Sequence, residues 1–244
     1  MSEPLVICYH ALSEQWPADL CVHPQAFEEQ LSHLVSKGYR GARFTDAVSS
    51  VPKGKTVVVT FDDAFRSVLD LAFPILERLG LPATVFAVSE FPREDHARPL
   101  SWPGIDHWEE GPHAHELASL SWSDLRELAD AGWEVGSHTR THPRLPELAQ
   151  GALQDELRAS RAACEEGMGH PCTSIAYPYG SVSPTVVDAA REAGYLAGAA
   201  LPPSWHEPAP LEWPRIGVYW NDDLRRFRLK ASPLVRQVRR FTGR

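Results

Sequence analysis

The chain has 244 residues, of which 43% are hydrophobic and 23% charged, and this composition excludes a disordered, collagen-like or coiled-coil protein. Its formal net charge of −8 argues against nucleic acid, a polyanion, as the main partner. No apolar run approaches the roughly 20 residues of a membrane-spanning helix. A chain of this length forms one large domain or two small ones.

The first residues and the cysteines bear on the cellular compartment. The opening sequence MSEPLVICYH lacks the basic start and the apolar core of a signal peptide. The four cysteines form no CxxC pair, which argues against a disulfide framework and against a thiolate zinc site. We therefore expect a cytoplasmic protein with reduced thiols.

Short apolar or β-branched runs alternate with helical patterns along the chain. In chain order, strands are predicted at 5–9, 56–61, 83–88, 134–137, 175–177 and 195–201. Helices are predicted between them at 27–35, 68–79, 121–129 and 183–194, with Pro74 kinking the second. Ser121 or Ser123 is expected to cap the third helix and Ser183 the fourth. This alternation predicts a parallel sheet that is buried on both faces.

One long segment, residues 90–120, shows no periodicity and is rich in Pro, His and Trp. A loop of this length in a compact domain is usually a lid or a binding loop. Its four histidines are irregularly spaced, which favours solvated side chains over metal ligands. They are His96, His107, His113 and His115.

Two carboxylates close the strongest predicted strand, in the sequence Thr60-Phe61-Asp62-Asp63. Adjacent acids after a buried apolar run are costly unless a positive charge balances them. Either they face one cavity at the end of the strand, or one of them caps the turn that follows.

Two histidines follow the next well-marked strand after the long loop, in the sequence HTRTH. His138 and His142 are four residues apart, which places two imidazoles on one side of a helical turn and suits tetrahedral zinc. The HExxH motif of zinc proteases is excluded, because Thr139 stands where its glutamate would be. Asp62 and Asp63 could supply the missing third ligand and a base, and such a mixed N and O set selects zinc or a similar transition metal.

The motif order TFDD, HTRTH and then AYPYG resembles the polysaccharide deacetylase (NodB-homology) family, carbohydrate esterase family 4. The similarity runs from ICYHAL near the start to PRIGVYW near Trp220. The resemblance implies an α/β fold, a single-domain distorted (β/α) barrel, over 1–223 with a long loop at 90–120. Residues 224–244 would then be a basic segment packed on the barrel or trailing it.

The resemblance also implies roles for the motif residues. Asp63, His138 and His142 would bind a divalent metal, Zn²⁺ before Ni²⁺ or Co²⁺. Asp62 would be the general base, and the backbone N–H of Tyr179 would help to hold the oxyanion. The implied reaction is metal-dependent removal of an N-acetyl group from an N-acetylated sugar, glycan or glycolipid.

Two departures from the family pattern affect the expected site. Ala176 stands where many members have an arginine that orients the base, and Arg215 is the candidate replacement, with a surface ion pair as the alternative. The late Leu-x-His motif that supplies the acid is also missing. His10, in the Tyr-His of a subgroup that reads AYPYG, is preferred as the acid over His206, although it could instead be satisfied within the barrel mouth.

Further residues are candidates for substrate contact. Eight tryptophans, six of them in or near predicted loops, give weak support for stacking against sugar faces. The candidates for substrate binding are Tyr177, Arg215, Trp205 and His206.

The C-terminal segment 224–244 carries eight Lys and Arg and no acidic residue. It is either a solvated helix against the acidic body or a surface that attracts anionic lipid or a phosphate-linked substrate, giving weak membrane-surface association. Two alternative functions stay open: hydrolysis of another C–N bond, such as a cyclic imide or amide, and a silent carbohydrate-binding barrel.

Overall fold

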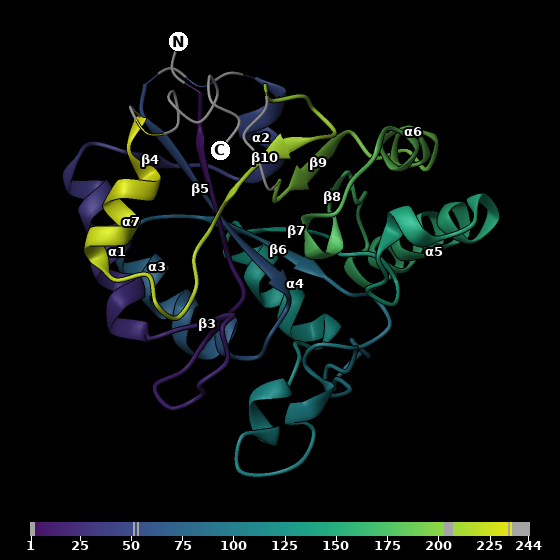
Figure 1. Ribbon diagram of the computed structural model, residues 1–244, viewed down its shortest axis with the longest axis horizontal. Helices are drawn as coiled ribbons and strands as arrows, with labels where there is room; N and C mark the ends of the chain where they lie inside the picture. The colour runs from purple at the N-terminus through teal and green to yellow at the C-terminus, as the bar shows by residue number, and fades with distance from the viewer. Residues whose placement is uncertain (1–2, 51, 53, 203–206, 234, 236–244) are drawn as a thin grey trace.

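The computed structural model describes residues 3–50, 52, 54–202, 207–233 and 235. A nine-stranded sheet curls into a nearly closed barrel in the order β10-β9-β8-β7-β6-β5-β1-β11, with β4 beside β5 (Figure 1). Every strand pair in it is parallel. Its strands are β1 (Leu5–Tyr9), β4 (Arg40–Gly41), β5 (Thr56–Asp63), β6 (Ala83–Ala87), β7 (Glu134–Ser137), β8 (Ser174–Ala176), β9 (Ala197–Ala200), β10 (Trp213–Pro214) and β11 (Ile216–Gly217). A separate pair joins β2 (Ala11–Leu12) to β3 (Cys21–Val22).

Helices surround this sheet, as Figure 1 shows, and confirm the predicted single-domain distorted (β/α) barrel. They are α1 (Pro24–Ser36), α2 (Phe44–Ser49), α3 (Phe73–Leu79), α4 (Trp122–Asp130), α5 (Gln150–Met168), α6 (Pro184–Glu192) and α7 (Leu224–Ala231). A π-helical turn at Val68–Ala72 precedes α3, where the proline predicted a kink. Short 3₁₀ turns lie at Asp106–Trp108, Ala114–Leu117, Leu145–Glu147 and Pro178–Gly180.

Most predicted elements lie close to their observed bounds. Ser121 rather than Ser123 caps α4, in a reciprocal capping box with Asp124, and Ser183 caps α6. The strand β5 extends two residues beyond the predicted end, so Asp62 and Asp63 lie within the ladder and pair with β6. Their place in the ladder excludes the turn-cap interpretation of this pair.

The longest helix, α5, has no counterpart among the predicted elements. Its buried face repeats at helical spacing but includes Glu156, Ser160 and Gly167 among the apolar residues. Apolar residues alone therefore do not mark that face, and a search for hydrophobic periodicity passes over it.

The barrel interior is apolar at one end and polar at the other. Strand side chains alternate, so Val6 and Val58 point inward and join a small core with Phe44 of α2 and Phe86. The Phe44 and Phe86 rings meet edge to face with their centroids 5.7 Å apart. Further along the inward face of β5 the side chains become polar, because Thr60 and Asp62 follow Val58 there and are buried.

The chain itself closes the barrel. Strand β10 pairs with β9, β11 pairs with β1, and one residue, Arg215, separates them. Its backbone N–H donates to the Ala200 carbonyl at 3.0 Å, and that of Val218 donates to the Cys8 carbonyl at 2.9 Å. A single extended segment thus passes from one edge of the sheet to the other, with Arg215 at the crossing.

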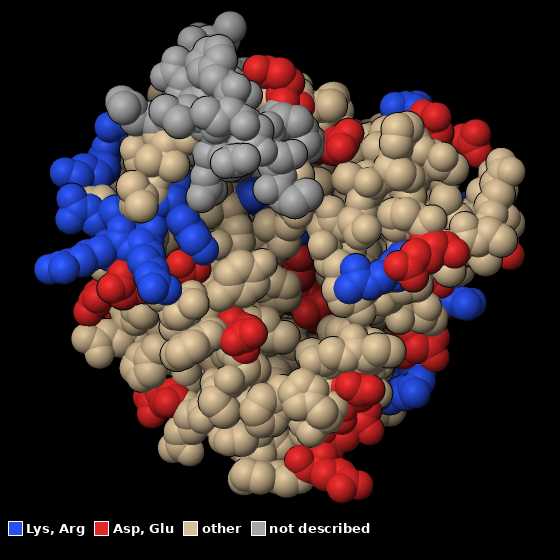
Figure 2. All heavy atoms as spheres, in the orientation of Figure 1, with Lys and Arg blue, Asp and Glu red and all other residues tan. Residues whose placement is uncertain are grey.

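The basic C-terminal segment begins as α7, which packs against α1 through Phe227. Lys and Arg side chains gather over this part of the surface in Figure 2, among them the exposed Arg225, Arg226 and Arg228. Residues 234 and 236–244 lie outside the described part of the chain. No helix in the described part is long and apolar enough to cross a membrane. Attraction to an anionic membrane surface and a cytoplasmic location stay predictions.

Replacing Gly136 with alanine should destabilise the barrel by about 1–3 kcal/mol through overpacking. A Cβ at this inward position of β7 would lie 2.5 Å from Ser174 Oγ and 2.7 Å from the Phe86 ring. Urea unfolding measures the loss. Gly151→Ala in α5 is the control, because a Cβ there meets no atom within 4 Å and should stabilise by about 0.5–1 kcal/mol. Equal stability of the two variants would contradict the packing described here.

Candidate active site

Three ligand-type side chains meet at the carboxyl ends of β5 and β7. Asp63 ends β5, His138 follows β7 directly, and His142 lies four residues later. Asp63 Oδ1 lies 3.3 Å from His138 Nε2 and 3.4 Å from His142 Nε2, and all three side chains are buried. Their ligand atoms lie within 4.8 Å of one another, so the structure brings the predicted metal ligands together.

The donor set of this triad suits a cation. His138 Nδ1 lies 2.8 Å from the Ala176 carbonyl, which can only accept, so Nδ1 keeps a proton and Nε2, which faces Asp63, is the ring atom that a metal can take. Burial lowers the pKa of His138, but the neighbouring carboxylates Asp62 and Asp63 outweigh it and raise that pKa. Burial, aided by the neighbouring His138, lowers the pKa of His142 to about 3, and its ring is neutral. One carboxylate oxygen and two imidazole Nε2 atoms therefore converge, and a divalent metal that displaces the Nε2 proton of His138 fits between them.

The backbone that brings these side chains together is left-handed rather than helical. The prediction that a helical turn spaces the two histidines is wrong, because Thr139 and His142 have φ of 67° and 63°. All the non-glycine residues with positive φ in the described chain lie in the three motifs or, in the case of Ala64, directly after one. They are Asp63, Ala64, Thr139, His142 and Tyr179. Such conformations cluster at functional sites, where surrounding bonds hold them in place.

The long loop 90–120 forms one wall of the site. Trp102 stacks on the His142 ring with centroids 4.2 Å apart and planes 25° apart, while Tyr179 meets the same ring edge-on at 4.7 Å. The Tyr179 hydroxyl donates to the Pro103 carbonyl at 3.3 Å, which ties the AYPYG segment to the loop. None of the loop's four histidines joins a metal-ligating cluster among the described residues.

The second aspartate of the pair, Asp62, is bound by a buried arginine. Arg215 Nη1 and Nη2 donate to its two carboxylate oxygens, each at 2.7 Å, and Nη1 also donates to Thr60 Oγ1 at 3.0 Å. Arg215 is 3% exposed, so the alternative of a surface ion pair is wrong. Burial alone would raise the pKa of Asp62, but the guanidinium and His138 hold it well below its usual range. Asp62 is therefore an anion of fixed orientation.

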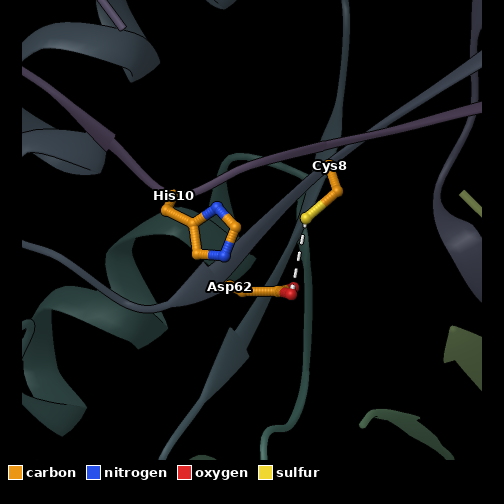
Figure 3. Close-up of side chains that lie close together, drawn as sticks. All are labelled: Cys8, His10 and Asp62. Carbon is orange, nitrogen blue, oxygen red and sulfur yellow. Dashed lines mark hydrogen bonds between the residues drawn. The ribbon is translucent and has the colours of Figure 1, made fainter. Parts of the chain in front are cut away.

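A second group of side chains lies on the other side of Asp62. Figure 3 shows Cys8 of β1, His10 just after that strand and Asp62 of β5 pointing toward one another. The Cys8 thiol donates to Asp62 Oδ2 at 3.4 Å. The Nδ1 of His10 is buried without a hydrogen-bond partner, so the interpretation of His10 as satisfied in the barrel mouth is wrong for that atom. These three groups could also surround a cation. Arg215, however, already binds both Asp62 oxygens, and its positive charge would repel a cation placed there.

A cavity of about 290 Å³ gives access to both groups. The residues that line it are Asp62, Asp63, His138, His142, His10, Leu20, Tyr219, Tyr179, Leu201 and residues 102–105. Figure 2 shows a hollow near the centre of the molecule with acidic side chains at its floor.

The remaining candidates lie elsewhere. Tyr177 is fully buried and donates its hydroxyl to the Leu211 carbonyl at 2.8 Å, so its side chain packs the barrel and does not contact a substrate in the cavity. Trp205 and His206 lie outside the described residues. Arg215 lies behind Asp62 and does not line the cavity.

Comparison with known proteins agrees with the site. Residues 49–198, more than half of the chain, match the family model described as polysaccharide deacetylase. The chain belongs to the polysaccharide deacetylase family. The crystal structure of BC0361, a polysaccharide deacetylase from Bacillus cereus, is similar with a TM-score of 0.76 and 26% identity, covering 95% of this chain and 69% of that one.

Two curated relatives place the chain among longer proteins of this family. YxkH of Bacillus subtilis (strain 168), which is named for the family, is 26% identical over 203 residues, covering 81% of this chain and 64% of its own. The poly-β-1,6-N-acetyl-D-glucosamine N-deacetylase of Staphylococcus aureus (strain MSSA476) is 23% identical over 193 residues, covering 74% and 61%. This polysaccharide deacetylase chain thus spans less than two thirds of the length of either relative.

Replacing Arg215 with methionine should destabilise the metal-free protein by about 3–5 kcal/mol near neutral pH, because it strands the buried Asp62 charge. In the wild type the pKa of Asp62 is depressed, so its stabilising effect is present above the unfolded value of about 4 and lost below it. In the variant burial raises that pKa, so protonation relieves the penalty as the pH falls. Urea unfolding with a chelator should show a smaller difference near pH 4.5 than near pH 7.

The double variant Asp62→Asn/Arg215→Met is the matched control for this pair. With neither charge buried, it should recover most of the stability that Arg215→Met loses. A double variant as unstable as Arg215→Met, or a penalty independent of pH, would show that Arg215 stabilises through packing alone.

Proposed function

We propose that this chain is a metal-dependent hydrolase that removes the N-acetyl group from an N-acetylated polysaccharide. The observation that carries the proposal is that two neighbouring carboxylates with different surroundings, Asp62 and Asp63, line the same cavity. Asp63 faces the Nε2 atoms of two imidazoles, while its neighbour Asp62 is held ionised by Arg215. Membership of the polysaccharide deacetylase family supports the reaction class, and the Staphylococcus aureus relative supports an N-acetylglucosamine polymer as substrate.

Asp63, His138 and His142 are the residues that would hold the metal. One carboxylate oxygen and two imidazole nitrogens, with room for further ligands, favour Zn²⁺, with Ni²⁺ or Co²⁺ as alternatives. When bound, such an ion supplies the Lewis acidity that activates water and polarises the acyl carbonyl. The Ala176 carbonyl fixes the tautomer of His138, and the Trp102 ring fixes the plane of His142.

The side chains around Asp62 divide the proton transfers between them. Asp62 accepts the proton of the attacking water, and Arg215 keeps its carboxylate ionised and oriented for this step. The backbone N–H of Tyr179 stabilises the charge that develops on the carbonyl oxygen. A protonated His10 then donates to the departing amine, so that one amide and one water give acetate and a free amino sugar.

His10 as the acid also assigns the chain to the subgroup with an N-terminal Tyr-His and an AYPYG motif. Strand β1 supports this assignment, because it directs Tyr9 outward to Gln30 and leaves His10 in the cavity. The aromatic rim formed by Trp102, Tyr179 and Tyr219 suits the apolar face of a sugar ring.

Metal content tests the site directly. Wild-type protein prepared without added metal should contain about one zinc, nickel or cobalt ion per chain by elemental analysis. His138→Ala should lose the ion, whereas Asp62→Asn should keep it and lose about 10²–10⁴-fold in deacetylation of N-acetylglucosamine oligomers. His107→Ala in the long loop is the control and should retain both properties.

The outcomes separate the alternatives. A wild type that neither contains nor takes up zinc would overturn the proposed chemistry. A metal-loaded wild type that binds sugar without turnover would favour the silent barrel, and turnover only on cyclic imides or amides would favour the other hydrolase.

Replacing His10 with alanine should slow deacetylation of an N-acetylated sugar by about 10²–10⁴-fold, because the amine is a poor leaving group without a proton donor. An aryl acetate ester needs no such proton, so its hydrolysis should fall far less. Steady-state rates on both substrates provide the measurement. An equal loss on amide and ester would show that His10 is not the acid.

A further inference from the structure

The backbone conformation of the segment between His138 and His142 depends on contacts with α5, although α5 supplies no candidate metal ligand. Thr139 and His142 both have left-handed φ angles, which non-glycine residues adopt only when neighbouring groups hold them. The position of His142 Nε2 opposite Asp63 follows directly from this backbone path. Whatever holds the path therefore sets the geometry of the triad.

Glu156 of α5 is the group that faces this segment. Its Oε1 accepts hydrogen bonds from the backbone N–H of Arg140 at 2.9 Å, from that of Thr141 at 2.6 Å and from Thr141 Oγ1 at 3.1 Å. Its Oε2 lies 3.7 Å from Arg140 Nε. Glu156 is 5% exposed, and all four of these contacts go to residues between His138 and His142. A buried carboxylate without such donors would be strongly disfavoured.

The other side of the segment is held by backbone and hydroxyl groups. The N–H of Ser89 donates to the Thr139 carbonyl at 3.1 Å, and that of Glu90 donates to the Arg140 carbonyl at 2.9 Å. Ser137 Oγ accepts from the Thr139 N–H at 3.1 Å. The carbonyls thus point toward the start of the long loop and the two N–H groups toward α5. Without Glu156 those two N–H groups would lose the side chain that accepts from both of them.

We infer that Glu156 is a positioning residue for the metal site. Its carboxylate fixes the left-handed turn between the histidines, so that His142 is already directed at Asp63 before an ion binds. This inference rests on the proposed function, because it assigns Glu156 to the same metal-binding triad. Glu156 lies outside the three motifs. We expect it to affect metal affinity through the backbone of residues 139–142, without contacting the ion.

The test is zinc affinity, measured at neutral pH by competition with a chromophoric chelator. Glu156→Ala should bind Zn²⁺ about 10–100-fold more weakly than the wild type, the usual effect of losing an outer-shell partner. Glu156→Gln should lie between them, because its amide oxygen can still accept from the two N–H groups but carries no charge. The matched control is Glu166→Ala, an exposed glutamate on the same helix, which should bind zinc like the wild type.

Two further readouts distinguish positioning from loss of fold. The Co²⁺-loaded Glu156→Gln protein should show an altered visible absorption spectrum, because His142 no longer coordinates as it does in the wild type. Its activity should recover as free zinc is raised, with the midpoint shifted by the same factor as the affinity. Unchanged zinc affinity in Glu156→Gln and Glu156→Ala would overturn the inference, and where Glu156→Ala does not fold the Glu156→Gln result alone decides. A wild type that binds no zinc would instead overturn the proposed function.

Discussion

The buried ion pair between Arg215 and Asp62 joins the closure of the barrel to the chemistry of the site. Arg215 lies between β10 and β11, where the chain leaves one edge of the sheet for the other, and its side chain reaches across the interior to β5. A buried carboxylate is stable only with a partner, and a buried guanidinium equally so. Each therefore requires the other, and the closure of the barrel and the orientation of Asp62, the proposed base, are fixed together.

A second constraint is the left-handed backbone at each of the three motifs. Glycine would adopt these angles more readily, but Asp63 and His142 carry the side chains of the proposed metal site. The cost is met by hydrogen bonds from elements outside the motifs, above all by Glu156 of α5 and by the backbone at Ser89 and Glu90. The outer barrel thus acts as the rigid support for a strained site.

The elements and site residues that depend on local sequence pattern can be predicted from the sequence. The apolar runs of β1 and β5 and the two carboxylates that end β5 are visible because buried parallel strands and acidic ends contrast sharply. The helix α5 is not predicted, because Glu156, Ser160 and Gly167 interrupt its apolar face and their burial depends on partners far away in the chain. The segment that closes the barrel, β10 to β11, is not predicted either, because strands of two residues each show no periodicity. Burial of Arg215 follows only from its contact with a residue 153 positions away.

The place of the arginine also explains why Ala176 is compatible with an active site. Ala176 points into the barrel beside Ala199 and Phe86, and the Arg215 guanidinium carbon lies 5.6 Å from the Phe86 ring centroid in the same interior. A second long cation from β8 would compete for this space and for the two oxygens of Asp62 that Arg215 already occupies. The small side chain at 176 instead leaves room for Arg215, while its carbonyl orients His138. An arginine at position 215, between β10 and β11, therefore keeps Asp62 paired, while β8 supplies the carbonyl that orients His138.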